Sequence, residues 1–271
     1  MNFYDKVYPV IREYDKETLV MYEPVTWGTM AHEGVLGTGF DHPPGNDSKG
    51  TVLSWHYYCW LLEFQATNNI NPLVNDTLPN FSRYFCNEWQ LNTYFDVVES
   101  DMKKLGDGAS FLTEFGWCAF PESNGTYNLE ACEAMLNGCD QHFQSWTYWD
   151  SGTLVDSNYD PLVNLFTRVY PVATNGIPLK MMYNTTTRDF FYSFQLNVTS
   201  FRESILTTDI FVPQYLYPNS FNVNTSENLD WKFDPLTSKV LLFLKTDLIK
   251  QFKNMKEYVY SSQASVTLSA N

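Results

Sequence analysis

Two spacings of apolar residues alternate along the first half of this 271-residue chain. Apolar positions three and four apart predict helices from Phe3 to Tyr14, from Leu91 to Leu105, where Gly106 supplies a stop, and over residues 128–143. Strand-like segments at 18–27, 51–60, 109–114 and 144–150 lie between them. The segment at 51–60 is nearly all apolar and aromatic, as expected for a strand with both faces covered. Strands that alternate with helices indicate parallel βα units.

The pattern changes after about residue 171. Short strand-like runs at 188–198, 208–218 and 239–245 are separated by turn-rich pieces, which is typical of an antiparallel β-sandwich. Pro171 and Asn175-Gly176 mark the junction. We therefore predict an α/β domain over 1–171 and an all-β sandwich domain over 172–271.

Composition narrows the functional class. Hydrophobic residues make up 44% of the chain and aromatic residues 17%, so it can bury a core and is not disordered. The net charge of -14 argues against binding to nucleic acid or, through charge, to anionic membranes. No apolar run has the length of a membrane-spanning helix, and the first ten residues do not resemble a signal peptide.

Glycosylation sequons and cysteines nevertheless indicate an exported protein. Five cysteines would allow two disulfides and one free thiol. We predict a secreted or lysosomal parent whose leader is missing from this sequence. Candidate N-glycosylation sites are Asn46, Asn75, Asn80, Asn124, Asn184, Asn197 and Asn224.

Polar or aromatic residues occur where each predicted strand ends. Each has an ordinary structural interpretation, such as an acid in solvent or a histidine in the core. Their combination is harder to explain in this way. Retaining glycoside hydrolysis needs a carboxylate nucleophile, a second carboxylate as acid/base about 5–5.5 Å away, donors that keep the nucleophile ionised, and an aromatic platform for the sugar. The residues are Glu23, His56 with Tyr58, Glu114, and Trp146 with Trp149.

Three motifs in this order, "SWHYY", "LTEFG" and "SWTYWD", resemble glycoside hydrolase family 5, and within it the endoglycoceramidase branch. "YEPVTWG", "GF" before "PPG", and "YP" near residue 170 extend the likeness over nearly the whole chain. The resemblance implies that 1–171 is the C-terminal half of a (β/α)8 TIM barrel, with strands five to eight. It also implies that the β-sandwich follows directly.

The same resemblance assigns roles to individual residues. Glu114 would be the nucleophile, Tyr58 would donate a hydrogen bond to it, and His56 would line the sugar subsite. Trp146 matches the strand-eight Trp that stacks on the sugar. Trp149 and Asp150 would be core and loop-anchoring residues that border the substrate.

This chain departs from the family pattern at the acid/base. That residue belongs to an Asn-Glu-Pro motif on strand four, and no such motif occurs in this sequence. "YEP" at 22–24 lies in the predicted strand five, so we interpret Glu23 as a structural or substrate-binding residue. The expectation is a truncated chain whose acid/base lies upstream of Met1. "RVYP" replaces the family's Arg-Pro-Tyr-Pro, which we expect to matter little in a linker.

Expected disulfides are Cys59 with Cys86 and Cys118 with Cys132, each closing a loop beside the active face, with Cys139 free. A zinc site is the alternative, although the spacings lack a CxxC pair. No cofactor or metal is expected, and no obligate protein partner. The resemblance implies a glycolipid or oligosaccharide substrate and transient contact with a lipid surface.

Three functions remain open from the sequence. The first is a retaining endoglycoceramidase, which cleaves the bond between oligosaccharide and ceramide. The second is a family relative that acts on another β-glucoside, such as a β-glucan or a steryl glucoside. The third is a catalytically inactive carbohydrate-binding protein, consistent with the missing acid/base.

Overall fold

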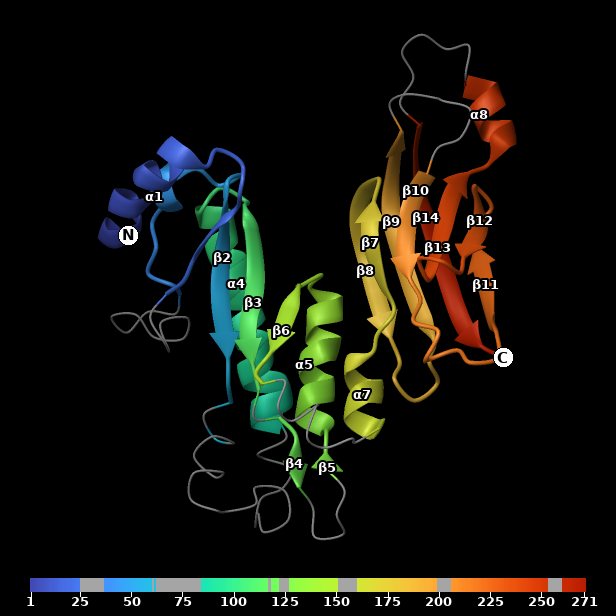
Figure 1. Cartoon of the computed structure of the whole chain (residues 1–271), viewed down its shortest axis with the longest axis horizontal. Coiled ribbons are helices and arrows are strands. Elements are labelled where there is room, and N and C mark those ends of the chain that lie inside the picture. The colour runs from blue at the N-terminus through green and yellow to red at the C-terminus, as the bar shows by residue number, and fades with distance from the viewer. Residues whose placement is uncertain are drawn as a thin grey trace. The chain divides into compact units, whose positions relative to one another are not determined.

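The structure is a computed structural model (Figure 1). It describes residues 1–24, 37–59, 61, 84–116, 118–121, 127–150, 160–198, 206–252 and 260–271. Residue contacts divide the chain into two compact units, 1–157 and 158–271. The second unit begins before the predicted boundary near 171 and therefore includes the helix at Asp160–Phe166. Residue 171 itself lies inside the strand Tyr170–Thr174.

A four-stranded parallel sheet forms the centre of the first unit, in the order β1-β2-β3-β6. Neighbours along the chain are therefore neighbours in the sheet, as expected for consecutive βα units. The first strand is shorter than predicted: residues 18, 19, 23 and 24 are described and lie outside it, and 25–27 lie outside the described residues. The elements of this unit are α1 (Asn2–Tyr14), β1 (Val20–Tyr22), the 3-10 helix η1 (Pro44–Asn46), β2 (Thr51–Tyr57), the π-helix η2 (Phe85–Gln90), α4 (Leu91–Lys104), β3 (Ala109–Phe115), β4 (Phe120–Pro121), β5 (Tyr127–Asn128), α5 (Glu130–Gln141) and β6 (Trp146–Tyr148).

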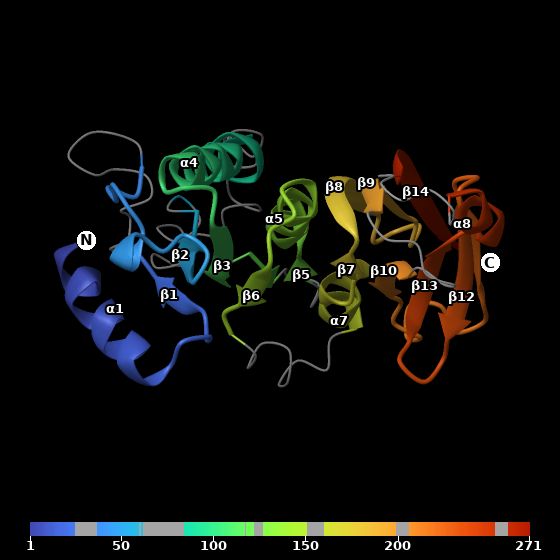
Figure 2. The ribbon, with the colours of Figure 1, turned by 90° about the horizontal axis from the view of Figure 1, so that it is seen from above.

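Helices α4 and α5 lie on the same side of this sheet (Figure 2). The predicted apolar row of α4, from Leu91 to Leu105, is buried throughout, and Gly106 follows with a φ of 90°. On α5 the prediction fails for Phe143, because the helix ends at Gln141. Phe143 adopts a positive φ and is 38% exposed.

The second unit consists mainly of two antiparallel four-stranded sheets, ordered β12-β13-β10-β7 and β11-β14-β9-β8. Alternate residues of β9, from Phe190 to Val198, point into one apolar core together with alternate residues of β13 and β14. The predicted sandwich is present (Figure 1). Its elements are α7 (Asp160–Phe166), β7 (Tyr170–Thr174), β8 (Gly176–Tyr183), β9 (Phe190–Val198), β10 (Leu206–Phe211), β11 (Phe221–Thr225), β12 (Leu229–Asp234), β13 (Lys239–Leu244), α8 (Thr246–Phe252) and β14 (Tyr260–Ala270).

Within the described ranges, every helix is too short or too polar to span a bilayer.

Candidate active site

The two faces of β2 carry different chemistry. Trp55 and Tyr57 pack against Tyr94 of α4, with ring centroids 6.4 and 5.1 Å from the Tyr94 ring, so odd-numbered residues face the helices. Side chains alternate along a strand, which places Ser54, His56 and Tyr58 on the opposite face. The candidate site is built on that opposite face.

An extra residue in β3 brings Glu114 onto this polar face. Leu112 pairs with Trp55 and Glu114 pairs with His56, so Thr113 has no separate partner on β2. The pairing with β6 shows the same extra residue. Leu112 pairs with Trp146 and Phe115 pairs with Tyr148, so an advance of three residues in β3 matches an advance of two in β6. Strict alternation would turn Glu114 toward the helices, and the bulge reverses it.

Glu114 meets both residues that the sequence assigned to it. The Tyr58 hydroxyl donates a hydrogen bond of 2.5 Å to Glu114 Oε1. His56 Nδ1 lies 4.0 Å from Glu114 Oε2. The Glu114 side chain is 30% exposed, so it is partly screened from water and still open to a ligand.

Glu23 completes a row of polar groups. His56 Nε2 lies 3.4 Å from Glu23 Oε1, so the imidazole stands between two carboxylates. Ser54 Oγ donates to Glu23 Oε2 over 3.2 Å and also contacts Thr113 Oγ1 at 2.5 Å. Sequence reasoning had missed Ser54 and Thr113, although the alternation on β2 could have identified Ser54.

The two candidate tryptophans have different surroundings. Trp146 and Tyr148 pack edge-on against the buried Phe115 on the helix side of the sheet, with ring centroids 5.7 and 5.5 Å from the Phe115 ring. Thr147 lies on the other face, where its hydroxyl donates to the Thr113 carbonyl. Trp149, the residue after β6, is 58% exposed, so the expectation that it is a core residue is wrong. Alternation continued past β6 would put its side chain on the face of Thr147.

Gly116 allows the ends of β3 and β6 to approach each other. The Trp149 backbone N–H donates to the Phe115 carbonyl over 2.9 Å. A Cβ atom at position 116 would overlap the Trp149 carbonyl oxygen and lie 3.4 Å from the Tyr58 ring. The Gly of "LTEFG" is therefore required by close backbone packing beside the nucleophile candidate.

Both predicted disulfides are present, Cys59–Cys86 and Cys118–Cys132, and Cys139 is free and buried. The zinc alternative is wrong for these four cysteines, because a disulfide offers no thiolate ligand. Across the described residues, no group of three or more His, Cys, Asp or Glu is arranged to hold a metal ion.

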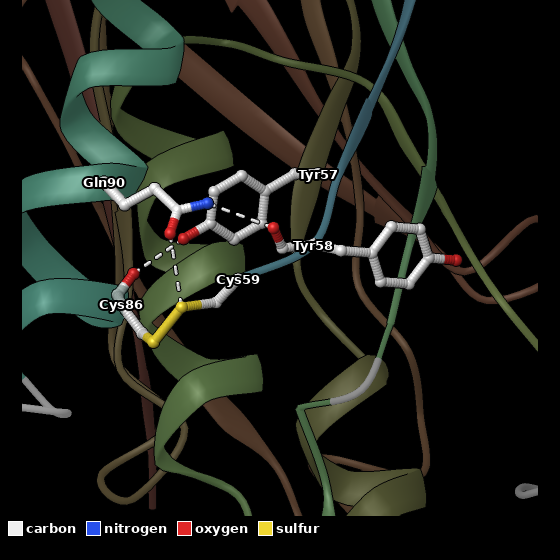
Figure 3. The surroundings of a disulfide bond; sticks show 5 residues. All are labelled: Tyr57, Tyr58, Cys59, Cys86 and Gln90. Atoms are coloured by element: carbon white, nitrogen blue, oxygen red, sulfur yellow. Dashed lines mark hydrogen bonds between the residues drawn. A yellow bond between two sulfur atoms is a disulfide. The ribbon is translucent and has the colours of Figure 1, made fainter. Parts of the chain in front are cut away.

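The first disulfide joins the end of β2 to η2 (Figure 3). Figure 3 shows the Tyr57 ring on the disulfide side and the Tyr58 ring on the opposite side. The Tyr57 hydroxyl donates to the Cys86 carbonyl over 2.7 Å. Burial raises the pKa of Tyr57 well above its ordinary value, so this phenol stays protonated and remains a donor.

Three candidate glycosylation sites are exposed: Asn46, Asn184 and Asn224. Asn197 is half-buried within β9. Asn75, Asn80 and Asn124 lie outside the described residues. Asp150 is exposed, and its proposed loop-anchoring role stays a prediction.

Comparison with known proteins places this geometry in a family. Residues 1–154 match the model for cellulase (glycosyl hydrolase family 5), and residues 168–251 match the glycoside hydrolase family 5 C-terminal domain. An endoglycoceramidase of Cyanea nozakii is 28% identical over 250 residues, which cover 84% of this chain and 42% of that protein.

Solved structures share the fold. Endo-glycoceramidase II from Rhodococcus sp., in complex with ganglioside GM3, aligns over 99% of this chain and 53% of its own with a TM-score of 0.67 and 16% identity. Sterylglucosidase 1 of Cryptococcus neoformans aligns over 82% of this chain and 38% of its own with a TM-score of 0.54 and 12% identity.

The chain thus spans about half the length of the relatives it matches. Its parallel sheet and sandwich have the fold of the corresponding part of these glycosidases, a partial (β/α)8 barrel with a C-terminal sandwich, as predicted. Because the cellulase model alone covers more than half of its residues, the chain belongs to glycoside hydrolase family 5.

Proposed function

We propose that this chain carries the nucleophile half of a retaining endoglycoceramidase-type active site. The observation that carries the proposal is the 2.5 Å hydrogen bond from Tyr58 to Glu114 on the polar face of the sheet. A donor of this kind stabilises the ionised carboxylate, which is the form that attacks.

In the proposed reaction a Glu114 oxygen attacks the anomeric carbon and the glycosidic C–O bond breaks. The leaving oxygen takes a proton from a general acid, and water later hydrolyses the glycosyl ester. His56 would line the sugar subsite, and Glu23 would orient its imidazole. The resemblance assigns the general acid to a motif that this sequence lacks, so the chemistry proposed for this chain is the nucleophilic step.

Trp149 is better placed than Trp146 to act as the sugar platform. Alternation puts it on the face of Glu114, and it is exposed. Trp146 packs against Phe115 on the helix side. We therefore propose that Trp149 stacks on the sugar and that Trp146 supports the end of β6.

Covalent trapping tests the nucleophile. A 2-deoxy-2-fluoro glycoside with a dinitrophenol leaving group needs no general acid and leaves a long-lived glycosyl-enzyme. Intact mass followed by peptide mapping should find the sugar on Glu114, and Glu114→Gln should not be labelled. Absence of labelling, or labelling elsewhere, would contradict the proposal and favour a carbohydrate-binding protein.

A steryl or other β-glucosidase is the second candidate, favoured by the likeness to sterylglucosidase 1. An enzyme that combines this chain with a general acid should hydrolyse a glycosphingolipid in detergent faster than a steryl glucoside or a soluble glucan, because contacts with the ceramide can be used in the transition state. A higher rate on the steryl glucoside would favour the second candidate.

A further inference from the structure

Gln90 lies behind the candidate site, on the helix side of β2. It is the last residue of η2 and has no exposed surface. Burial of an amide is costly unless its polar atoms find hydrogen-bond partners. The Gln90 nitrogen finds one in the backbone carbonyl of Tyr58.

The Gln90 amide contacts the chain where β2 ends. Its Nε2 donates to the Tyr58 backbone carbonyl over 3.0 Å, and its Oε1 lies 3.3 Å from Cys59 Sγ (Figure 3). Gln90 is also the residue that precedes α4. Its side chain therefore ties the end of β2 to the start of that helix.

Three consecutive residues are tied to η2. Tyr57 bonds to the Cys86 carbonyl, Tyr58 accepts from Gln90, and Cys59 forms the disulfide with Cys86. Pairing with β3 ends at Tyr57, so the ladder does not fix the backbone of Tyr58. The contacts with η2 therefore hold the chain in place after the pairing with β3 has ended.

We propose that Gln90 is a positioning residue for the nucleophile: by fixing the Tyr58 backbone it holds the Tyr58 hydroxyl on Glu114. The inference rests on the proposed function of Glu114. Gln90 itself does not touch substrate, because it lies on the opposite side of β2.

The test uses the 271-residue chain with Gln90→Met, which keeps the side-chain length and removes the donor. Thr93→Val is the matched control, since it removes the 2.7 Å bond to the Trp89 carbonyl within the same helical segment. Tyrosine labelled at Cζ reports the state of the Tyr58 hydroxyl by NMR, assigned with Tyr58→Phe. The second readout is the rate of covalent trapping.

Gln90→Met should move the Tyr58 resonance toward its position in Glu114→Ala and slow trapping about 10- to 100-fold. Thr93→Val should change neither. An unchanged Tyr58 resonance in folded Gln90→Met, or an equal change in Thr93→Val, would overturn the inference. If circular dichroism shows that Gln90→Met is unfolded, Gln90→Asn, whose amide is one methylene shorter, is judged by the same two readouts.

The two proposals fail differently. Absence of trapping in the unaltered chain contradicts the assignment of Glu114 as the nucleophile. The Tyr58 resonance alone then shows whether Gln90 holds the Tyr58 hydroxyl on Glu114. Slower trapping with an unchanged resonance overturns the positioning role, because Gln90 would then act by another route.

Discussion

Glu114 faces the polar side of the sheet because β3 contains one residue more than its neighbours match. Thr113 is that residue, and its hydroxyl contacts Ser54. Without it, a charged side chain would point toward the apolar layer under α4 and α5, where an unpaired carboxylate is costly. The bulge in the β3 backbone therefore determines on which face of the sheet Glu114 lies.

Gly116 gives the first residue-scale prediction. Gly116→Ala should lower the stability of the first unit by about 1–3 kcal/mol, because the added methyl overlaps the Trp149 carbonyl. It should also slow covalent trapping, since the same methyl approaches the Tyr58 ring. Urea unfolding and the trapping rate measure the two effects.

Gly138→Ala is its control. A Cβ there would lie 2.7 Å from the Phe95 ring in the helix layer, away from Glu114. This variant should lose stability while trapping, measured well below its unfolding midpoint, stays at the rate of the unaltered chain. Equal trapping rates in both variants would show that crowding at Gly116 does not reach the site.

At the scale of elements, the two disulfides differ in the length of chain that they close. Their sequence separations are 27 for Cys59–Cys86 and 14 for Cys118–Cys132. Loop-closure entropy predicts a loss of about 3–4 kcal/mol for the paired Ala substitutions at Cys59 and Cys86. The shorter pair should cost about 0.6 kcal/mol less.

Denaturant unfolding of the two double variants measures these losses. A larger loss for the shorter loop would mean that native contacts around Cys118 outweigh chain entropy.

Asp101 links α4 to the segment that precedes η1. Its carboxylate is 3% exposed and accepts from the Thr38 backbone N–H, the Thr38 hydroxyl and Lys104 Nζ at 2.5, 2.7 and 2.8 Å. Burial alone would raise the pKa of Asp101, but the hydrogen bonds from Lys104 and Thr38 outweigh it and lower the pKa. The folded state thus favours the ionised form.

A pH dependence follows from that lowered pKa. The contribution of Asp101 should be fully present above about pH 4, near the ordinary Asp pKa, and lost as the pH falls through the lower folded value. Asp101→Asn should cost about 1–3 kcal/mol at pH 7, and the gap to the unaltered chain should shrink toward pH 3. Exposed Asp96→Asn on the same helix is the control. A gap that stays constant from pH 7 to pH 3 would contradict this role.

For the whole molecule, an exposed row of apolar residues on α1 is the feature most expected to cause self-association. Four of the five apolar residues that predict this helix are exposed, namely Phe3 at 69%, Val7 at 36%, Val10 at 54% and Tyr14 at 85%. The fifth, Ile11, is half-buried. Within the described residues α1 docks through the buried Tyr8, whose ring would meet a Cβ at Gly45 of η1. An exposed row of this kind favours association.

The isolated chain should therefore self-associate as its concentration rises, also because β1 and β6 are the outer strands of the described parallel sheet. Val10→Glu should reduce association in analytical ultracentrifugation. Lys6→Glu, on an exposed polar position of α1, should not. A monomer at every concentration would contradict the prediction.

Local pattern was enough to predict much of this protein. Apolar periodicity depends on nearby residues only, so the sequence predicts the buried row of α4 and the change from βα units to a sandwich, and the structure confirms both. The motifs around His56, Tyr58 and Glu114 pointed to the family for the same reason, since each lies within one strand and its end. The disulfide partners also agreed with prediction.

Tertiary structure decided what depends on register and on contacts distant in sequence. One extra residue in β3 turns Glu114 to the polar face, and burial distinguishes Trp146, which packs against Phe115, from the exposed Trp149. Gln90 meets Tyr58 across 32 positions of sequence, which no periodicity encodes. Register and burial are set by the packing of whole elements against each other, so a local pattern can identify a residue type but not the face or partner that the fold assigns to it.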